Sequence, residues 1–202
     1  MTKRNTDHRS GPVILVTGAS SGIGAATAIH FGAHGYKVVL AARRLERLQE
    51  VAQEVRKEGG EALSVQTDVT ELSHLHHLVD CAEGTYGRVD ILVNNAGMGR
   101  LKWLDELDPG HEITDQIAVN LTGSIQLTRL VLPSMMERRQ GHIIHVSSVA
   151  AWVAPPTYSV YTATKFGMKG FLESLRREVG AFGIHVGAVY PGPVATEFDE
   201  HA

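Results

Sequence analysis

The sequence predicts a single-domain, three-layer α/β fold in which a doubly wound parallel sheet lies between two layers of helices. Two observations predict it: short apolar, β-branched segments recur along the chain, and segments of helical length and pattern separate them. Most of the apolar segments do not alternate with polar residues, which is typical of strands buried on both faces. Strands that alternate with helices form right-handed βαβ units, and these build a parallel sheet with helices on both faces.

The elements follow one another in a regular order. The expected strands are residues 13–17, 37–42, 62–67, 89–93, 142–146 and 184–189. The expected helices are residues 22–34, 45–57, 72–86, about 112–139 and about 159–180. The first helix consists mostly of small and apolar residues. The second places Leu45, Leu48, Ala52 and Val55 at helical spacing, and the third repeats the pattern with Leu72, Leu75, Val79 and Ala82, so each has one apolar face.

The composition agrees with one folded domain, residues 12–202, behind a polar tail, residues 1–11. The chain has 202 residues, of which 43% are hydrophobic and 20% charged, and a domain of this length needs no disulfide or metal to stabilise it. A net charge of −3 gives no basic field for nucleic acid or an anionic membrane. The single cysteine, Cys81, fits a reducing compartment, and we expect a cytoplasmic location because no signal peptide or membrane span is evident.

The segment after the first strand carries the first functional signal. Strand 13–17 runs directly into TGASSGIG, residues 17–24, and a helix begins there. Glycines let the chain turn sharply and let a ligand approach the backbone. The N–H groups of the following helix then face an anion, usually a pyrophosphate. The alternative is a glycine-rich loop that only turns the chain, but its position between a first strand and a helix favours the binding site.

From this turn onward the chain resembles the short-chain dehydrogenase/reductase family. The matching motifs span nearly the whole chain and are, in order, TGASSGIG, Asp68-Val69, Asn94-Asn95-Ala96-Gly97, Asn120, Ser147-Ser148, Tyr161-x-x-x-Lys165 and Pro191-Gly192. The resemblance implies a Rossmann fold, a nicotinamide dinucleotide cofactor, and interconversion of an alcohol and a carbonyl by hydride transfer.

The resemblance also implies which residues bind the dinucleotide. Those expected at the pyrophosphate turn are Gly18, Ser20, Ser21, Gly22, Ile23 and Gly24. Those expected around the adenine ring and the neighbouring ribose are Asp68, Val69, Asn95, Ala96 and Gly97. Those expected at the nicotinamide end are Pro191, Gly192, Val194 and Thr196, together with Tyr161 and Lys165.

The end of the second strand bears on which dinucleotide is preferred. Folds that prefer NAD usually carry an acidic residue there, bonded to the ribose 2′-hydroxyl, but this chain has Ala42, followed by Arg43 and Arg44. Two guanidinium groups can bind a phosphate, so we expect a preference for NADP(H) that rests mainly on Arg43, with NAD(H) as the other cofactor. The alternative is that both arginines are solvated. Many NADP-preferring relatives carry a basic residue just before the second glycine, where this chain has Ser21.

Tyr161 and Lys165 lie four positions apart on a predicted helix, so their side chains are neighbours on one face. A free tyrosine, with a pKa of about 10, is a poor acid or base at neutral pH, and a nearby ammonium group favours the phenolate. By the resemblance, Tyr161 exchanges the proton and Lys165 also holds the ribose of the nicotinamide. The family's spacing selects Ser148 over Ser147 to hydrogen-bond the substrate oxygen. Asn120 would anchor a water that links Lys165 to solvent.

Other candidate residues receive structural interpretations. His74, His76 and His77 are expected on a solvated helix face rather than at a metal, and no metal site is predicted. Cys81 is expected to be a small core residue. Trp152 either lines the substrate pocket or packs against its neighbours.

Members of the family usually continue after the Pro191-Gly192 motif with a mobile segment, a further helix and a last strand. The sequence stops at Ala202, so we expect it to lack that C-terminal helix and last strand. The resemblance further implies a homodimer or homotetramer. The leading hypothesis is an NADP(H)-dependent oxidoreductase with a small-molecule carbonyl or alcohol substrate. The alternative is a non-catalytic NADP(H)-binding regulatory or scaffold protein, which is less favoured because such relatives tend to lose the tyrosine or the lysine.

Overall fold

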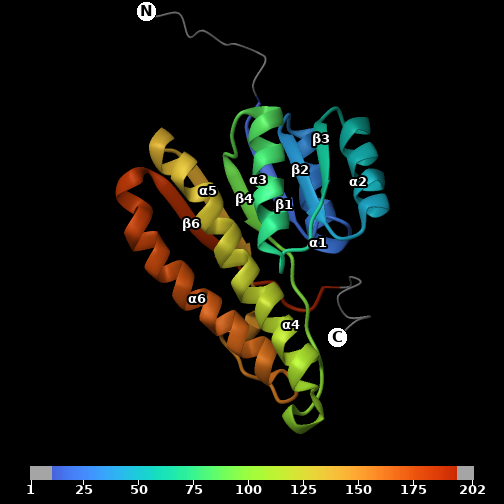
Figure 1. Cartoon of the computed structure of the whole chain (residues 1–202), viewed down its shortest axis with the longest axis vertical. Helices are drawn as coiled ribbons and strands as arrows, with labels where there is room; N and C mark the ends of the chain where they lie inside the picture. Colours follow the sequence, from blue (N-terminus) through green and yellow to red (C-terminus); the bar gives the residue numbers. More distant parts are fainter. Residues whose placement is uncertain (1–10, 195–202) are drawn as a thin grey trace, which may run out of the picture.

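The predicted strands form one six-stranded parallel sheet in the order β3-β2-β1-β4-β5-β6 (Figure 1). The computed structural model describes residues 11–194, so Thr196 and all of the predicted tail except Gly11 lie outside the described residues. The strands are β1 (Val13–Thr17), β2 (Lys37–Ala42), β3 (Glu61–Gln66), β4 (Ile91–Asn94), β5 (Gly141–Val146) and β6 (Ile184–Val189). This order reverses between β1 and β4, as in doubly wound dinucleotide-binding folds. The predicted fold class is confirmed.

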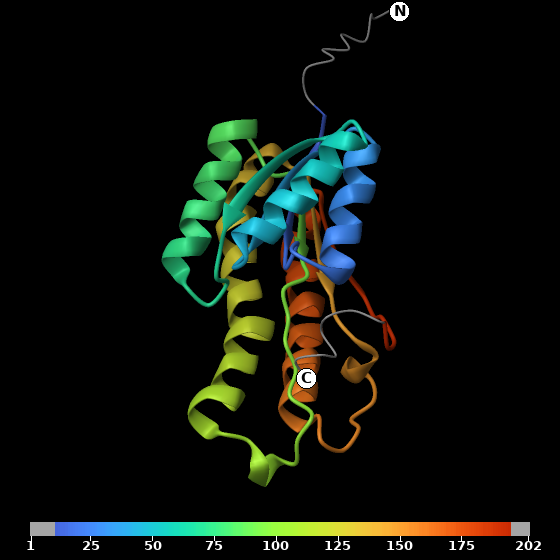
Figure 2. The ribbon, with the colours of Figure 1, turned by 90° about the vertical axis from the view of Figure 1, so that its right-hand side faces the viewer.

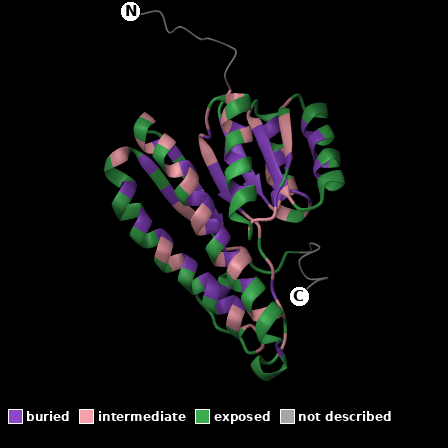
Figure 3. Ribbon diagram, in the orientation of Figure 1, coloured by how far each residue is buried: buried purple, intermediate pink, exposed green. Residues whose placement is uncertain are grey.

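Helices cover both faces of the sheet (Figure 2). The α-helices are α1 (Gly22–Ala33), α2 (Leu45–Lys57), α3 (Leu72–Tyr86), α4 (Thr114–Ile117), α5 (Ser124–Arg138) and α6 (Ser159–Val179). One apolar core joins the sheet to α1 and α2, and a second joins its other face to α3, α5 and α6. The inner strands β1, β2 and β4 are accordingly the most deeply buried elements (Figure 3).

On the α1 side, the sheet is open over β5 and β6. His142 and His185 are exposed there, and their rings stack at a centroid distance of 5.0 Å. Val189, at the end of β6, is also exposed. Parallel sheets are usually covered on both faces, and within residues 11–194 this part of the sheet is covered on one face only.

The predicted helix at about 112–139 is helical throughout, but its first half contains π-helical turns, which are wider than an α-helix. π-Helical turns at Pro109–Ile113 and Ala118–Gly123 flank α4, and regular winding resumes in α5. Such turns often lie at functional sites. Apolar periodicity predicts the helix but not this local winding, because the winding depends on contacts made by single residues.

Two of those contacts are made by the second π-turn. Asn120 Nδ2 donates to the Met98 carbonyl at 2.7 Å, and Asn120 Oδ1 accepts from the Met98 N–H at 2.8 Å. Gly123 lies against Val69, and a Cβ at Gly123 would overlap the Val69 carbonyl oxygen. The turn therefore connects the segment after β4 with the segment after β3.

The carboxyl ends of β1 and β4 are crosslinked by Asn95. Its Nδ2 donates to the carbonyl oxygens of Thr17 and Gly18 at 3.0 and 3.2 Å. The N–H groups of Asn95 and Ala96 both donate to Thr17 Oγ1 at 3.0 Å. Glycines make this approach possible: a Cβ at Gly24 would lie 2.5 Å from Asn95 Nδ2 and would overlap the Gly18 carbonyl oxygen.

We predict that Gly24→Ala lowers the free energy of unfolding by about 1–3 kcal/mol, the usual effect of overpacking a buried site. Urea denaturation measures it. The matched control is Gly170→Ala, in the middle of α6, where an added Cβ has no neighbour within 4 Å. That change should stabilise the protein by about 0.5–1 kcal/mol, since alanine is the better helix former. Equal effects of the two substitutions would contradict the crosslink.

Candidate active site

A cavity of about 1060 Å³ follows the carboxyl ends of the strands, from the glycine turn to α6. This is where doubly wound folds bind their ligands. The predicted site residues that line it are Gly18, Ser20, Ser21, Gly22, Ile23, Arg43, Arg44, Asp68, Val69, Asn95, Ala96, Gly97, Ser148, Tyr161, Lys165, Pro191, Gly192 and Val194. Gly24 and Asn120 lie behind its walls, and Thr196 is outside the described residues.

The glycine turn forms the first end of the cavity. Gly18 and Gly22 have φ angles of 63° and 53°, which favour glycine, and α1 begins at Gly22. The side of the turn is closed by Arg44, whose Nη2 donates to the hydroxyls of Ser20 and Ser21 at 3.2 Å. Helix N–H groups, two serine hydroxyls and a guanidinium group at one place suit a phosphate-bearing ligand.

Next to the turn, the ends of β2 and β3 form a second part of the wall. Thr70 donates from its N–H and its Oγ1 to Asp68 Oδ1, at 3.0 and 2.7 Å. Burial alone would raise the pKa of the Asp68 carboxyl, but these hydrogen bonds and the charge of Arg43 lower it below its usual value. Asp68 is therefore a carboxylate near Arg43 at neutral pH.

At the other end, Tyr161 and Lys165 point from α6 toward the end of β5. Tyr161 is 7% exposed and Lys165 is 3% exposed. Lys165 Nζ lies 5.3 Å from the centre of the Tyr161 ring and donates to the Val146 carbonyl at 3.4 Å. The spacing thus brings a phenol and an ammonium group together beside the segment that carries Ser148.

Burial acts on both groups in the direction of the neutral form. It raises the pKa of Tyr161, although the hydrogen bond between the Ser148 and Tyr161 side chains lowers it in part. It lowers the pKa of Lys165 to about 8. At neutral pH, Tyr161 is therefore a protonated phenol, able to donate a proton, and Lys165 is still mainly charged.

Asn120 connects the cavity wall to α6 without facing the cavity. Besides its two bonds to Met98, its Nδ2 donates to Thr164 Oγ1 at 3.3 Å. Thr164 Oγ1 in turn donates to the Tyr161 carbonyl at 2.6 Å. The Asn120 side chain is thus used to hold the Met98 backbone beside the turn of α6 that bears Tyr161.

Most of the cavity wall next to Tyr161 is formed by residues that were not predicted from the sequence. Its lining residues there are Met98, Gly99, Arg100, Asp115, Val119, Val149, Val153, Pro155 and Tyr158. They either follow the Asn95-Ala96-Gly97 motif directly, lie on the long helix or fall between Ser148 and Tyr161. That position in the chain is the only signal in a single sequence that could have found them, because their residue types are common.

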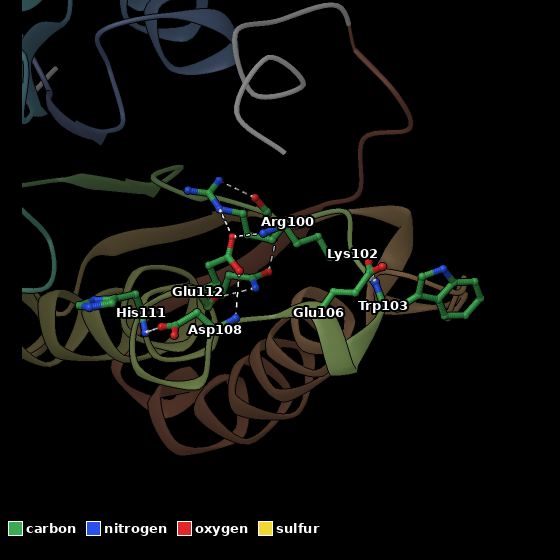
Figure 4. Close-up of polar contacts among 9 residues, drawn as sticks. Arg100, Lys102, Trp103, Glu106, Asp108, His111 and Glu112 are labelled. Atoms are coloured by element: carbon green, nitrogen blue, oxygen red, sulfur yellow. Dashed lines mark hydrogen bonds and ion pairs between the residues drawn. The ribbon is translucent and has the colours of Figure 1, made fainter.

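Glu112 holds the segment that carries Arg100 (Figure 4). Its Oε1 lies 2.7 Å from Lys102 Nζ and 3.7 Å from Arg100 Nε, and its Oε2 accepts from the Asp108 N–H at 3.0 Å. Trp103, on the same segment, points away from this cluster in Figure 4 and is exposed. One carboxylate therefore anchors a loop that forms part of the cavity wall.

The histidines of α3, Cys81 and Trp152 lie outside the lining of the cavity. His74, His76 and His77 are exposed on α3, and residues 11–194 contain no group of three or more His, Cys, Asp or Glu side chains that could hold a metal. Cys81 is half-buried against the core. Trp152 is absent from the lining of the cavity and contacts Tyr190 and Lys169 instead. None of the described helices is long and apolar enough to cross a membrane.

Known proteins of one kind resemble this chain. The family model for short chain dehydrogenases matches residues 12–202. An uncharacterized oxidoreductase of Listeria innocua serovar 6a is 41% identical over 190 residues, which cover 93% of this chain and 76% of the relative. A metagenomic short-chain oxidoreductase, solved in complex with NADP, is similar with a TM-score of 0.87 at 40% identity, over 92% of this chain and 84% of that one. A short chain dehydrogenase/reductase from Burkholderia phymatum, solved in complex with NAD, has a TM-score of 0.91 at 30% identity, over 95% and 69%.

His145 is a buried titratable residue close to this site that the sequence did not single out. It lies on β5, immediately before Val146, and is 1% exposed. Neither of its ring nitrogens has a hydrogen-bond partner among the described residues. Burial, assisted by the charge of Lys165, lowers the pKa of His145 to about 3. The folded protein therefore holds a neutral imidazole behind Lys165.

We predict that His145 makes the protein sensitive to mild acid. Because its pKa is depressed from 6.5 to about 3 on folding, the unfolded chain binds the proton first, and stability falls as the pH drops below 6.5. The loss is about 1.4 kcal/mol per pH unit. His145→Asn should therefore lose about 2 kcal/mol less than the wild type between pH 7 and pH 5, as measured by urea denaturation. The control His142→Asn, at an exposed position of the same strand, should keep the wild-type acid sensitivity. An unchanged acid sensitivity of His145→Asn would refute the assignment.

Proposed function

Since the chain belongs to the short-chain dehydrogenase/reductase family, we propose that it is an NADP(H)-dependent oxidoreductase that interconverts an alcohol and a carbonyl, with Tyr161 as the general acid and base. One observation carries the proposal. Tyr161, Ser148 and Lys165 lie at one end of a single cavity, and the glycine turn lies at the other. A dinucleotide along the cavity would have its pyrophosphate at the turn and its nicotinamide beside these three residues.

The residues present fit such a cofactor. The N-terminus of α1 and the Ser20 hydroxyl would hold the pyrophosphate. Asp68 and Val69 would flank the adenine ring, and the segment from Pro191 to Val194 would contact the nicotinamide end. The NADP and NAD complexes of the two solved relatives support a nicotinamide cofactor. When bound, the cofactor supplies or accepts the hydride.

The protein's side chains would handle the proton. In the direction of reduction, Tyr161 donates its proton to the carbonyl oxygen of the substrate and is left as a phenolate. The Ser148 hydroxyl donates a hydrogen bond to the same oxygen while negative charge develops on it. The Lys165 ammonium group, 5.3 Å from the centre of the Tyr161 ring, stabilises the phenolate. The raised pKa of Tyr161 keeps it protonated at neutral pH, which suits proton donation.

The preference for NADP(H) is proposed from the end of β2. Ala42, Arg43 and Arg44 line the cavity there, and Ala42 stands at the end of β2 where folds that prefer NAD usually carry an acidic residue. Arg44 bonds to Ser20 and Ser21, whereas the charge of Arg43 acts on Asp68. Arg43 is therefore our candidate for the 2′-phosphate. The cytoplasmic location and the homodimer or homotetramer stay predictions.

We predict that Tyr161→Phe lowers kcat for carbonyl reduction by about 10²–10⁴-fold, the usual contribution of a general acid. NADPH absorbance with a panel of aldehydes, ketones and keto-esters measures turnover. NADPH binding, measured by calorimetry, should be retained, because only one hydroxyl is lost.

Tyr158→Phe is the matched control, since Tyr158 lines the same cavity and its ring centre lies 5.7 Å from that of Tyr161. This variant should keep most of the activity. Turnover retained by Tyr161→Phe would remove Tyr161 from its role. NADPH binding without turnover of any carbonyl by the wild type would favour the non-catalytic alternative.

We predict that Arg43→Ala lowers the NADPH/NADH ratio of kcat/KM by about 10- to 100-fold, the loss expected for a hydrogen bond between charged groups. Steady-state kinetics with both cofactors measures it. Arg47→Ala is the control, because Arg47 lies on the exposed face of α2 in an ion pair with Glu50. If the ratio is the same in Arg43→Ala as in the wild type, Arg43 does not select the cofactor.

A further inference from the structure

Trp152 lies at the junction of three segments that build the catalytic end of the cavity. Lys169 Nζ stands 3.2 Å from the centre of its ring system, which is a close cation–π contact. On another side, the Tyr190 ring meets Trp152 in a T-shaped arrangement with a centroid distance of 5.5 Å. Trp152 nevertheless remains 59% exposed. Its packing alone therefore contributes little to the core.

Each of the three segments contributes to the cavity. Trp152 belongs to the connection from β5 to α6, which begins at Ser148 and lines the cavity through Val149, Val153, Pro155 and Tyr158. Lys169 is on α6, one turn after Lys165. Tyr190 precedes Pro191, Gly192, Pro193 and Val194, which also line the cavity. Trp152 lies on the connection that carries Ser148. Its indole contacts Lys169 of α6, the helix that carries Lys165, and Tyr190, which precedes the residues expected at the nicotinamide end.

Backbone hydrogen bonds secure the start of the connection more firmly than its middle. The Ser147 N–H donates to the Val189 carbonyl at 2.9 Å, and the Val149 N–H donates to the Pro191 carbonyl at 3.1 Å. The far end is attached by the Lys102 N–H, which donates to the Thr157 carbonyl at 3.1 Å. Between these ties, residues 153–156 are all exposed. Trp152 is where this exposed stretch begins.

We propose that Trp152 and Lys169 are positioning residues, which hold the 149–158 connection against α6 and so fix the substrate wall of the cavity. The inference rests on the proposed function. The indole face and the ammonium group act through the backbone: neither touches the cavity, but both determine where Val153 and Tyr158 stand. Trp152 and Lys169 would therefore affect binding of the carbonyl substrate, but not proton transfer or binding of the cofactor phosphates.

Amide hydrogen exchange, followed by mass spectrometry, tests the contact without requiring turnover. In Lys169→Met, which keeps an unbranched apolar side chain without the charge, exchange in residues 149–158 should be about two- to five-fold faster, as loss of a cation–π contact implies. Trp152→Leu should act in the same way. The double variant should exchange no faster than Trp152→Leu, because the two side chains act as one pair. Lys169→Arg should restore protection, since a guanidinium group also stacks on an indole.

Kinetics then tests the consequence for the substrate. Lys169→Met should raise KM for the carbonyl about two- to five-fold while kcat and the NADPH dissociation constant stay unchanged, and Lys169→Arg should restore KM. Lys57→Met, at a lysine on α2 whose side chain is 66% exposed, is the control for loss of an exposed ammonium group and should change neither KM nor exchange in residues 149–158.

The outcomes separate this inference from the proposed function. Unchanged exchange in Lys169→Met overturns the positioning pair, whatever the enzyme does. Faster exchange with an unchanged KM also overturns it, since the contact would then be only structural. A wild type that turns over no carbonyl would contradict the proposed function, and with it a role for the pair in substrate binding. Exchange would still show whether Lys169 holds the connection.

Discussion

The glycine-turn end of the cavity depends on the crosslink between β1 and β4. Asn95 donates hydrogen bonds to the carbonyl groups of Thr17 and Gly18, at the point of the sheet where the strand order reverses. It can come this close only because Gly18 and Gly24 have no side chains. The approach of the two strand ends therefore depends on the Asn95 amide, directly after β4, as much as on the glycine turn itself. The glycine turn is therefore more than a local feature of its loop, because it also takes part in the contact between the ends of β1 and β4.

The parts of the structure that could be predicted from the sequence are those that depend on residues close together in the chain. Strands and helices follow from the periodicity of apolar residues, and Tyr161 and Lys165 share a helix face because their separation is short. The boundaries of the strands and helices depend on more than this periodicity. The strand expected at 89–93 is Ile91–Asn94, and Asp90, just before it, bonds to Val13 through both its N–H and its carboxylate.

The cavity walls could not be predicted in the same way. They are loops whose positions depend on contacts between residues far apart in the chain. The Arg100 N–H, for example, donates to Gln116 Oε1 at 3.3 Å. Such contacts leave no period and no fixed spacing in a single sequence. The neutral imidazole of His145 was missed for a related reason: burial beside Lys165 gives this residue its character, and burial of one strand residue depends on the whole fold.

At the Tyr161 end of the cavity, one physical effect acts on the pKa values of two groups in opposite directions. Burial raises the pKa of the Tyr161 phenol and lowers that of the Lys165 ammonium group. Both changes disfavour charge, so the side chains alone do not produce a phenolate at neutral pH. The Ser148 hydrogen bond works against this tendency. A desolvated site of this kind responds strongly to any charge that enters it, because little water is present to screen that charge.

The contact between Gly123 and the Val69 carbonyl has a mechanical consequence. The same π-turn contacts Met98 and Thr164 through Asn120, so it joins the loop that follows β3 to the turn of α6 that bears Tyr161. Gly123 has no side chain between its backbone and the Val69 carbonyl group. We therefore expect that a displacement of the loop that follows β3 also moves the turn of α6 that bears Tyr161.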